Sequence, residues 1–287
     1  MKVNSLKRDD PSFPAILKQI HSVPEQLFWL GSTPEEWLQL PRVAVVGSRK
    51  VSAYGREVTS QLAKELAKHG VVVISGLALG VDSIAHQAAL EVGGQTIAIL
   101  PAGLDKIYPA SHAGLARSII AHGGALVSEY PLGATPHKQN FIARNRIVSG
   151  LVDVLVITEA AAASGSLHTA RFALEQGKTV MAVPGNITSP LSEGANNLIK
   201  SGAVPVTGVE DVLFALGLEI GQQKIPRLFS GNDQERAVFE LITSGITAQE
   251  DLAIELSLDG ASLATILTML EINGHIRPAG AGYWLVA

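Results

Sequence analysis

Six short runs rich in β-branched residues pass through residues 42–217, each followed by a small-residue loop and a segment of helical length. Such runs are typical of strands buried on both faces, and their alternation with helices is typical of a parallel α/β sheet. Right-handed crossovers bring the loops that follow parallel strands to one edge of the sheet, where ligands bind. The sequence therefore predicts an α/β domain with a mostly parallel sheet, whose strands begin at Val43, Val71, Thr96, Ala125, Val154 and Thr179.

The last part of the chain has a different pattern. The helical segments DQERAVFELI, TAQEDLAIELSL and SLATILTMLEING are followed by two short strand-like runs in HIRPAGAGYWLV. Thr247 and Glu250 have the spacing of a capping box at the start of the second segment. Three helices and a hairpin predict a small C-terminal winged-helix domain.

These patterns divide the chain into four parts. The first 41 residues are short and punctuated by prolines, so we expect an N-terminal extension packed as a brace on the core rather than a separate domain. The expected boundaries are 1–41 for this extension, 42–217 for the sheet domain, 218–231 for a linker and 232–287 for the winged-helix domain.

The amino-acid composition excludes several kinds of site and several classes of protein. The 287 residues include no cysteine, which excludes disulfides, thiolate metal sites and cysteine nucleophiles. The eight histidines lack ligand spacing, so we expect no metal and no cofactor. No apolar run reaches the ~18 residues that a membrane span needs, and the first residues lack the apolar core of a signal peptide. These features predict a cytoplasmic protein without a membrane partner.

The loops that follow the expected strands are rich in glycine and serine. They include GSRK at 47–50, SGLALGVD at 75–82 and EAAAASGS at 159–166. Glycine lets a backbone approach a ligand closely, and free N–H groups at helix starts attract anions. Any one such loop is equally well explained as a tight connection, but several together favour a phosphate-binding edge.

The familiar nucleotide motifs are nevertheless missing. GLALG lacks the glycine spacing of a dinucleotide site, and no acidic residue ends the second strand to hold a ribose. Gly177, Lys178 and Thr179 imitate the end of a P-loop, but Phe172 stands where that motif requires glycine. A dinucleotide cofactor or a P-loop nucleotide is therefore not expected.

The segment PHKQNFIARNRIVSGL at 136–151 combines cations with an aromatic ring. Lys138, Arg144 and Arg146 could pair with phosphates, and Phe141 could stack on a base. A helix with a buried Phe141 and ordinary surface ion pairs explains the segment equally well. Arg49 adds a cation at the same sheet edge, which favours binding of single-stranded nucleic acid.

Charge separates the two domains. Residues 227–287 hold 3 basic and 8 acidic residues, whereas residues 42–226 hold 15 basic and 13 acidic residues. The third C-terminal helix, which would enter a major groove, contains no Lys or Arg and could hardly neutralise phosphates there. We therefore expect the winged helix to contact protein rather than duplex DNA, which argues against a transcription factor.

Together, VAVVGSR, VISGLALGVDSIAHQAAL, ILPAGLDKIYP, FIARNRIVSGL and SGSLHTARFALEQGK resemble the DNA-processing protein A family, also called DprA or Smf. The resemblance implies an extended Rossmann-like domain and a non-catalytic protein. It also implies that the protein binds single-stranded DNA, forms a homodimer and helps load the RecA recombinase onto incoming DNA in natural transformation. Ile142 and His112 stand where the family usually has proline and asparagine. The N-terminal helical domain of many members is not expected here.

The resemblance also implies functional residues. Leu198 and Ile199, in GANNLIKSGA, are the expected dimer contacts. The nucleic-acid-binding residues implied by position are Gly47, Ser48, Arg49, Ser75, Gly76, Lys138, Phe141, Arg144, Asn145, Arg146, Ser164, Gly165 and Ser166.

An enzyme of the phosphoribohydrolase-like Rossmann class is the alternative, because such nucleotide-binding proteins share the sheet and a glycine-rich loop. Their phosphate loop is followed by a glutamate. In SGSLHTAR the equivalent position is Arg171, and Glu175 comes a turn later. The sequence therefore lacks the expected catalytic carboxylate.

Overall fold

A computed structural model describes residues 2–218, 232–280 and 282–286. The chain divides into two compact units, Met1–Ile220 and Gly221–Ala287. The expected linker, 218–231, lies outside the described residues except for Leu218. Each unit has its own hydrophobic core.

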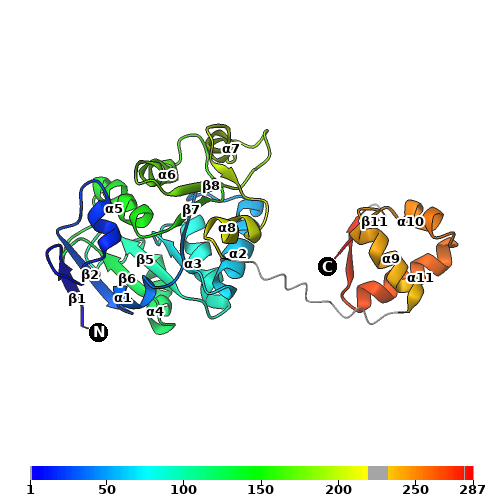
Figure 1. Ribbon diagram of the computed structural model, residues 1–287, viewed down its shortest axis with the longest axis horizontal. Coiled ribbons are helices and arrows are strands. Elements are labelled where there is room, and N and C mark those ends of the chain that lie inside the picture. The colour runs from blue at the N-terminus through cyan, green and yellow to red at the C-terminus, as the bar shows by residue number, and fades with distance from the viewer. Residues whose placement is uncertain (1, 219–231, 281, 287) are drawn as a thin grey trace. The chain divides into compact units, whose positions relative to one another are not determined.

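The first unit is built on one mixed sheet (Figure 1). Its described strands follow the order β1-β2-β6-β5-β4-β3-β7-β8-β9, and all pairs from β6 to β9 are parallel. The bounds are β1 Asn4–Lys7, β2 Gln26–Gly31, β3 Arg42–Val46, β4 Val72–Ser75, β5 Thr96–Leu100, β6 Ala125–Ser128, β7 Val154–Ile157, β8 Thr179–Ala182 and β9 Val204–Pro205. The expected α/β class and mostly parallel sheet are confirmed.

Helices cover both faces of this sheet because the central strands are apolar on both sides. In β3, Val43 and Val45 pack with α2, α3 and α8, while Ala44 and Val46 pack with α5, α6 and α7. The bounds are η1 Ala15–Gln19, α1 Pro34–Trp37, α2 Ala53–Lys68, α3 Val81–Glu91, η2 Ala110–His112, α4 Ala113–Ala121, α5 Lys138–Gly150, α6 Ser166–Glu175, α7 Glu193–Lys200 and α8 Val209–Ala215.

The first 41 residues enter the sheet itself, which differs from the expected brace. β2 pairs antiparallel with β6, and β1 pairs with β2, so these two strands extend the edge. Leu17 and Trp37, from the same segment, are buried in the hydrophobic core that also contains residues of α5. The extension is therefore an integral part of the first unit.

The second unit is a winged helix, as predicted. Its core joins α9 and α11 to β10 through Val238, Leu267 and Ile276, among other apolar residues. The bounds are α9 Asp233–Thr243, α10 Gln249–Glu255, α11 Gly260–Ile272, β10 Ile276–Gly280 and β11 Tyr283–Val286, with the last two paired antiparallel.

The predicted capping box of α10 is wrong. The helix begins after Ala248, whose side chain offers no cap. Thr247 instead accepts a backbone hydrogen bond from Trp284 (2.9 Å), and Ala248 bridges to Tyr283, so pairing with the wing determines this helix start. A complete capping box occurs at α9, between Asn232 and Glu235.

Among the described residues, no single helix is long and apolar enough to cross a membrane; α10 and α11 reach that length and apolarity only together, and the pair is bent by 114°. No group of three or more His, Cys, Asp or Glu side chains in these ranges has the arrangement of a metal site.

Candidate nucleic-acid interface

The strand order reverses direction at β3, which lies between β4 and β7. Loops that leave a parallel sheet at such a point diverge and open a crevice at the carboxyl ends of the strands. A cavity of about 830 Å³ lies there, which we call the edge cavity. It is lined by the loops after β3, β4, β5 and β7 and by one face of α5.

The edge cavity gathers most of the expected binding residues. Only Ser75 and Arg146 of that set are not among its lining residues. Those that do line it are Gly47, Ser48, Arg49, Gly76, Lys138, Phe141, Arg144, Asn145, Ser164, Gly165 and Ser166. Their convergence from four separate segments is a property of the fold.

The loop after β3 is held between its neighbours. The backbone N–H of Ser48 donates to the Glu159 carbonyl (2.7 Å), and the Ser48 carbonyl accepts the backbone N–H of Val81 (3.1 Å). A Cβ on Gly47 would lie 2.6 Å from the Glu159 carbonyl oxygen and from Val81 Cγ2, so glycine is required for this close approach. This packing directs the exposed Arg49 and Lys50 to the cavity rim.

Three cations line the cavity with exposed side chains: Arg49, Lys50 and Lys138. None of them forms an ion pair with a carboxylate of the described residues. Exposed, unpaired cations along a concave wall are suited to a polyanion. Lys50 was not among the residues expected from the sequence, although it adjoins the GSR motif.

Two aromatic rings stand beside these cations. Tyr108 and Phe141 meet edge to face, with ring centroids 5.3 Å apart, and the Arg49 guanidinium carbon lies 5.4 Å from the Phe141 centroid. Phe141 is half-buried and Tyr108 is 49% exposed. Tyr108 was missed because it lies far from the basic segment in sequence and joins it only through the fold.

The serine-rich loop after β7 forms a further wall of the edge cavity. Ser164 and Ser166 share a hydrogen bond between their hydroxyl oxygens (2.8 Å) at the start of α6. Gly165 between them is exposed. The positive end of the α6 dipole and these hydroxyl groups favour an anion on this wall.

Two internal carboxylates correct the expectation that the glycine loops offer their N–H groups to phosphate. Asp82 Oδ2 accepts the backbone N–H groups of Gly76 (3.1 Å) and Ala78 (3.3 Å). Glu159 accepts the backbone N–H of Ser52 (2.9 Å) and also the Ser52 hydroxyl at the start of α2. These donors are already satisfied within the protein.

Arg144 lines the edge cavity, but its guanidinium group is held by the protein's own backbone. Its side chain is buried, 4% exposed, and Nη1 donates to the carbonyls of Gly76 (2.6 Å) and Ile99. Burial lowers its pKa to about 10, and Asp82 opposes that shift. Burial likewise raises the pKa of Asp82, opposed by Arg144.

Arg146 and Ser75 also differ from expectation. Arg146 lies two residues beyond Arg144, which is about 200° around α5. It pairs with both carboxylate oxygens of Glu129 (2.7 Å each) rather than facing the edge cavity. Ser75 is fully buried and donates its hydroxyl to the Val45 carbonyl (2.8 Å).

The expected dimer contacts lie on α7. Leu198 and Ile199 are half-buried and pack against the core of their own unit, beside α6 and β8. Part of the surface of each side chain is therefore already buried within its own unit.

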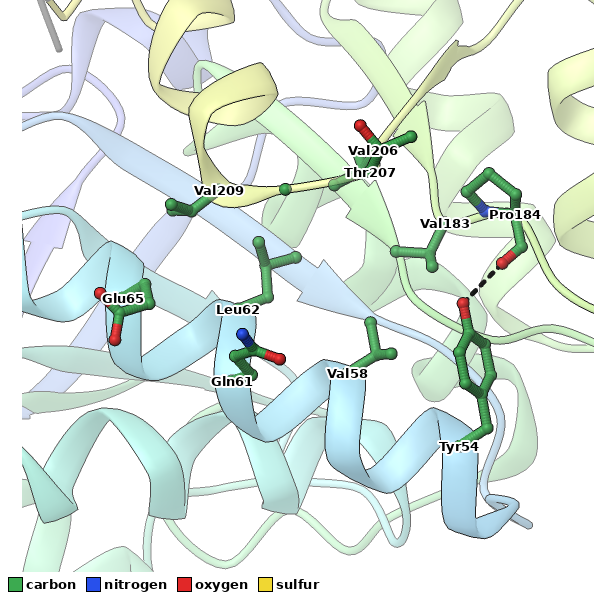
Figure 2. Close-up of a pocket in the computed structure, with 11 residues that line it drawn as sticks. Tyr54, Val58, Gln61, Leu62, Glu65, Val183, Pro184, Val206, Thr207 and Val209 are labelled. Carbon is green, nitrogen blue, oxygen red and sulfur yellow. Dashed lines mark hydrogen bonds between the residues drawn. The ribbon is translucent and has the colours of Figure 1, made fainter. Parts of the chain in front are cut away.

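A second pocket of about 360 Å³ lies between α2 and the segment around β9 and α8 (Figure 2). Val58, Val183 and Val206 contribute to its mainly apolar lining, and the Tyr54 hydroxyl donates to the Pro184 carbonyl (2.7 Å). None of its described lining residues is a cation. Its chemistry does not suit a polyanion.

Two family models match this chain over most of its length. The model of a family described as DNA recombination-mediator protein A matches residues 4–217, and one described as the DprA winged helix domain matches residues 223–282. Protein Smf of Escherichia coli is 43% identical over 252 residues, covering 84% of this chain and 67% of that protein. Protein Smf of Synechocystis is 38% identical, covering 80% of this chain but 56% of its own length.

Solved structures show the same similarity. DNA processing protein A from Streptococcus pneumoniae matches with a TM-score of 0.69 and 40% identity, over 75% of this chain and 74% of that one. The Helicobacter pylori protein of the same name, described for its single-stranded DNA binding mode, matches with a TM-score of 0.67 and 34% identity. That match covers 75% of this chain and 96% of the other.

Proposed function

Because this chain belongs to the DNA recombination-mediator protein A family, we propose that it binds single-stranded DNA in the edge cavity as a non-catalytic mediator. In this role it protects incoming DNA and helps load RecA in recombination and natural transformation. The observation that supports this proposal best is the grouping of Arg49, Lys50 and Lys138 beside the rings of Tyr108 and Phe141. Cations that follow a backbone and rings that stack on bases are what single strands require.

The proposal is tested by titration with single-stranded and double-stranded oligonucleotides of equal length at two salt concentrations. We expect tighter binding of the single strand and an affinity that falls as salt rises, because cations that neutralise phosphates release counterions. Equal binding of both forms, or binding insensitive to salt, would contradict it.

The phosphoribohydrolase-like alternative is not favoured. Arg171 and Glu175 form an ion pair with each other on the exposed side of α6 (2.8 Å), and neither lines the edge cavity. The carboxylate that does line it, Asp82, already accepts two backbone N–H groups. This arrangement supports binding rather than hydrolysis.

Replacing Phe141 by alanine should weaken single-strand binding by about 1–3 kcal/mol, because a stacking face is lost. The ring is only half-buried, so the melting temperature should change little. Fluorescence anisotropy and calorimetry on the same preparation measure both effects, with Phe141→Leu as a control for apolar volume. A large fall in melting temperature with normal binding would make Phe141 a packing residue.

Deleting residues 227–287 should leave single-strand affinity nearly unchanged or slightly higher. The removed part carries 3 basic and 8 acidic residues and so repels a polyanion, and this effect weakens with salt. The remaining part keeps its own core. A folded truncated protein that binds tenfold more weakly, ~1.4 kcal/mol, would instead place Arg277, Tyr283 and Trp284 in contact with the strand.

We also propose that the protein forms a homodimer through its first unit, with Leu198 and Ile199 of α7 at the contact. Both side chains keep part of their surface exposed, and β9 is the last of the described strands on that side of the sheet. Analytical ultracentrifugation should give a mass that rises from monomer to dimer through the micromolar range. A monomer mass at every concentration, or a dimer unaffected by Leu198→Glu, would contradict this contact.

A further inference from the structure

Side chains from three separate elements form hydrogen bonds with the backbone of the loop after β4. Arg144 of α5 donates to the Gly76 carbonyl (2.6 Å), and Asp82 of α3 accepts the Gly76 N–H (3.1 Å). Asp82 also accepts the Ala78 N–H (3.3 Å), while the His112 Nδ1 lies 2.8 Å from the Leu77 carbonyl oxygen. Three side chains from separate elements thus hold consecutive backbone groups of residues 76–78.

The conformation that they hold is an unfavourable one. Leu77 has a φ of +57°, in the left-handed region that residues other than glycine rarely adopt, and its side chain is fully buried. Strained backbone persists only where its surroundings hold it in place. The side-chain contacts to Gly76, Leu77 and Ala78 supply that constraint.

Gly76 fits flat against the guanidinium group. A Cβ at this position would lie 2.4 Å from Arg144 Nη2 and 2.5 Å from Cζ. Gly76 and Ala78 line the edge cavity. The same loop continues into Val81, whose backbone N–H donates to the Ser48 carbonyl (3.1 Å). A shift of this loop would therefore move the segment that carries Arg49.

We propose that Arg144 and Asp82 are positioning residues: they clamp the Gly76–Leu77 backbone between them and so shape the edge cavity for single-stranded DNA, without either side chain contacting a phosphate. This inference rests on the proposed function for its effect on binding. The clamp itself is present in the DNA-free protein.

Salt dependence separates a clamp from a phosphate contact. Each phosphate contact removed should make the slope of log affinity against log salt less steep by about 0.7 for a single strand. We expect Arg144→Met to weaken binding about tenfold with an unchanged slope, whereas Arg49→Ala weakens binding and also reduces the slope. An unchanged affinity, or a slope that falls as in Arg49→Ala, overturns the proposal.

A second variant removes the risk that Arg144→Met leaves Asp82 buried without its opposite charge. Asp82→Asn combined with Arg144→Met removes both charges and keeps a side-chain oxygen for the two N–H groups. Gly76→Ala tests the same loop with no change of charge. Both should lose about tenfold in affinity at an unchanged salt slope, and wild-type binding by both would overturn the proposal.

Amide hydrogen exchange on the DNA-free protein tests the clamp independently of binding. The amides of Gly76 and Ala78 should exchange at least tenfold faster in Arg144→Met than in wild type, while amides in α2 keep their wild-type rates. Wild-type exchange at both positions overturns the clamp. If the wild type proves not to bind single-stranded DNA, the proposed function fails while this measurement still decides the clamp.

Discussion

Gly80→Ala is expected to lower the free energy of unfolding of the first unit by about 3 kcal/mol. Gly80 has a φ of +82° and a ψ of −128°, which side-chain-bearing residues rarely adopt. A Cβ there would also lie 2.3 Å from the Ser48 carbonyl oxygen and 2.7 Å from that of Arg49. Relieving these clashes would break the hydrogen bond between Val81 and Ser48, so single-strand affinity should fall as well.

Gly70→Ala is the matched control for this effect. Gly70 also has a positive φ, +73°, but a Cβ at this position would have no neighbouring atom within 4 Å, and the residue is remote from the edge cavity. Its replacement should cost only about 1 kcal/mol, from backbone strain alone. Urea unfolding of both variants measures the difference. Equal losses in the two would show that the contact between the loops after β3 and β4 contributes nothing.

Arg49→Ala is expected to weaken single-strand binding at least tenfold at low salt, ~1.4 kcal/mol or more. The exposed guanidinium group has no carboxylate partner among the described residues and lies over the Phe141 ring. Its loss removes a phosphate contact and one cation–π partner. The salt slope should become less steep by about 0.7.

Arg117→Ala provides the comparison at equal charge. Arg117 is exposed on α4 and does not line the edge cavity. It should bind single strands with wild-type affinity and slope, since a remote charge acts only through a screened field. If both variants retain wild-type binding and slope, the edge cavity is not the binding site.

The positions of the sheet strands follow from local sequence. Runs such as VAVVG and VLVIT are apolar at nearly every position, which suits strands covered on both faces. The structure places them at β3 and β7, within a residue of the expected bounds. The winged helix was likewise predictable, because helical and strand periodicities are properties of neighbouring residues.

The sheet edge that holds the site was also predictable, since parallel strands bring their following loops together. The two strands from the first 41 residues were not. QLFWLG in β2 has no distinctive alternation, and its place depends on pairing with β6, nearly 100 residues later in the chain. Non-local pairing of this kind leaves no local signal.

The roles of individual site residues were decided by the tertiary structure. The sequence places Arg144 and Arg146 in one basic segment, but the helix directs them to different sides. Arg144 donates to the Gly76 carbonyl in the loop after β4, and Arg146 pairs with Glu129. Asp82 accepts backbone N–H groups of the glycine-rich loop after β4, which was expected to offer them to phosphate, and Glu159 accepts one at the start of α2.

The physical reason is that local sequence indicates which residues are buried, but not which group forms the hydrogen bond to a buried backbone group. Local sequence determined which segments form strands and helices and which of their residues are apolar enough to be buried. Which carboxylate or guanidinium group satisfies a given buried backbone group depends on residues far apart in sequence, such as Arg144 and Gly76, that only the packed sheet brings together.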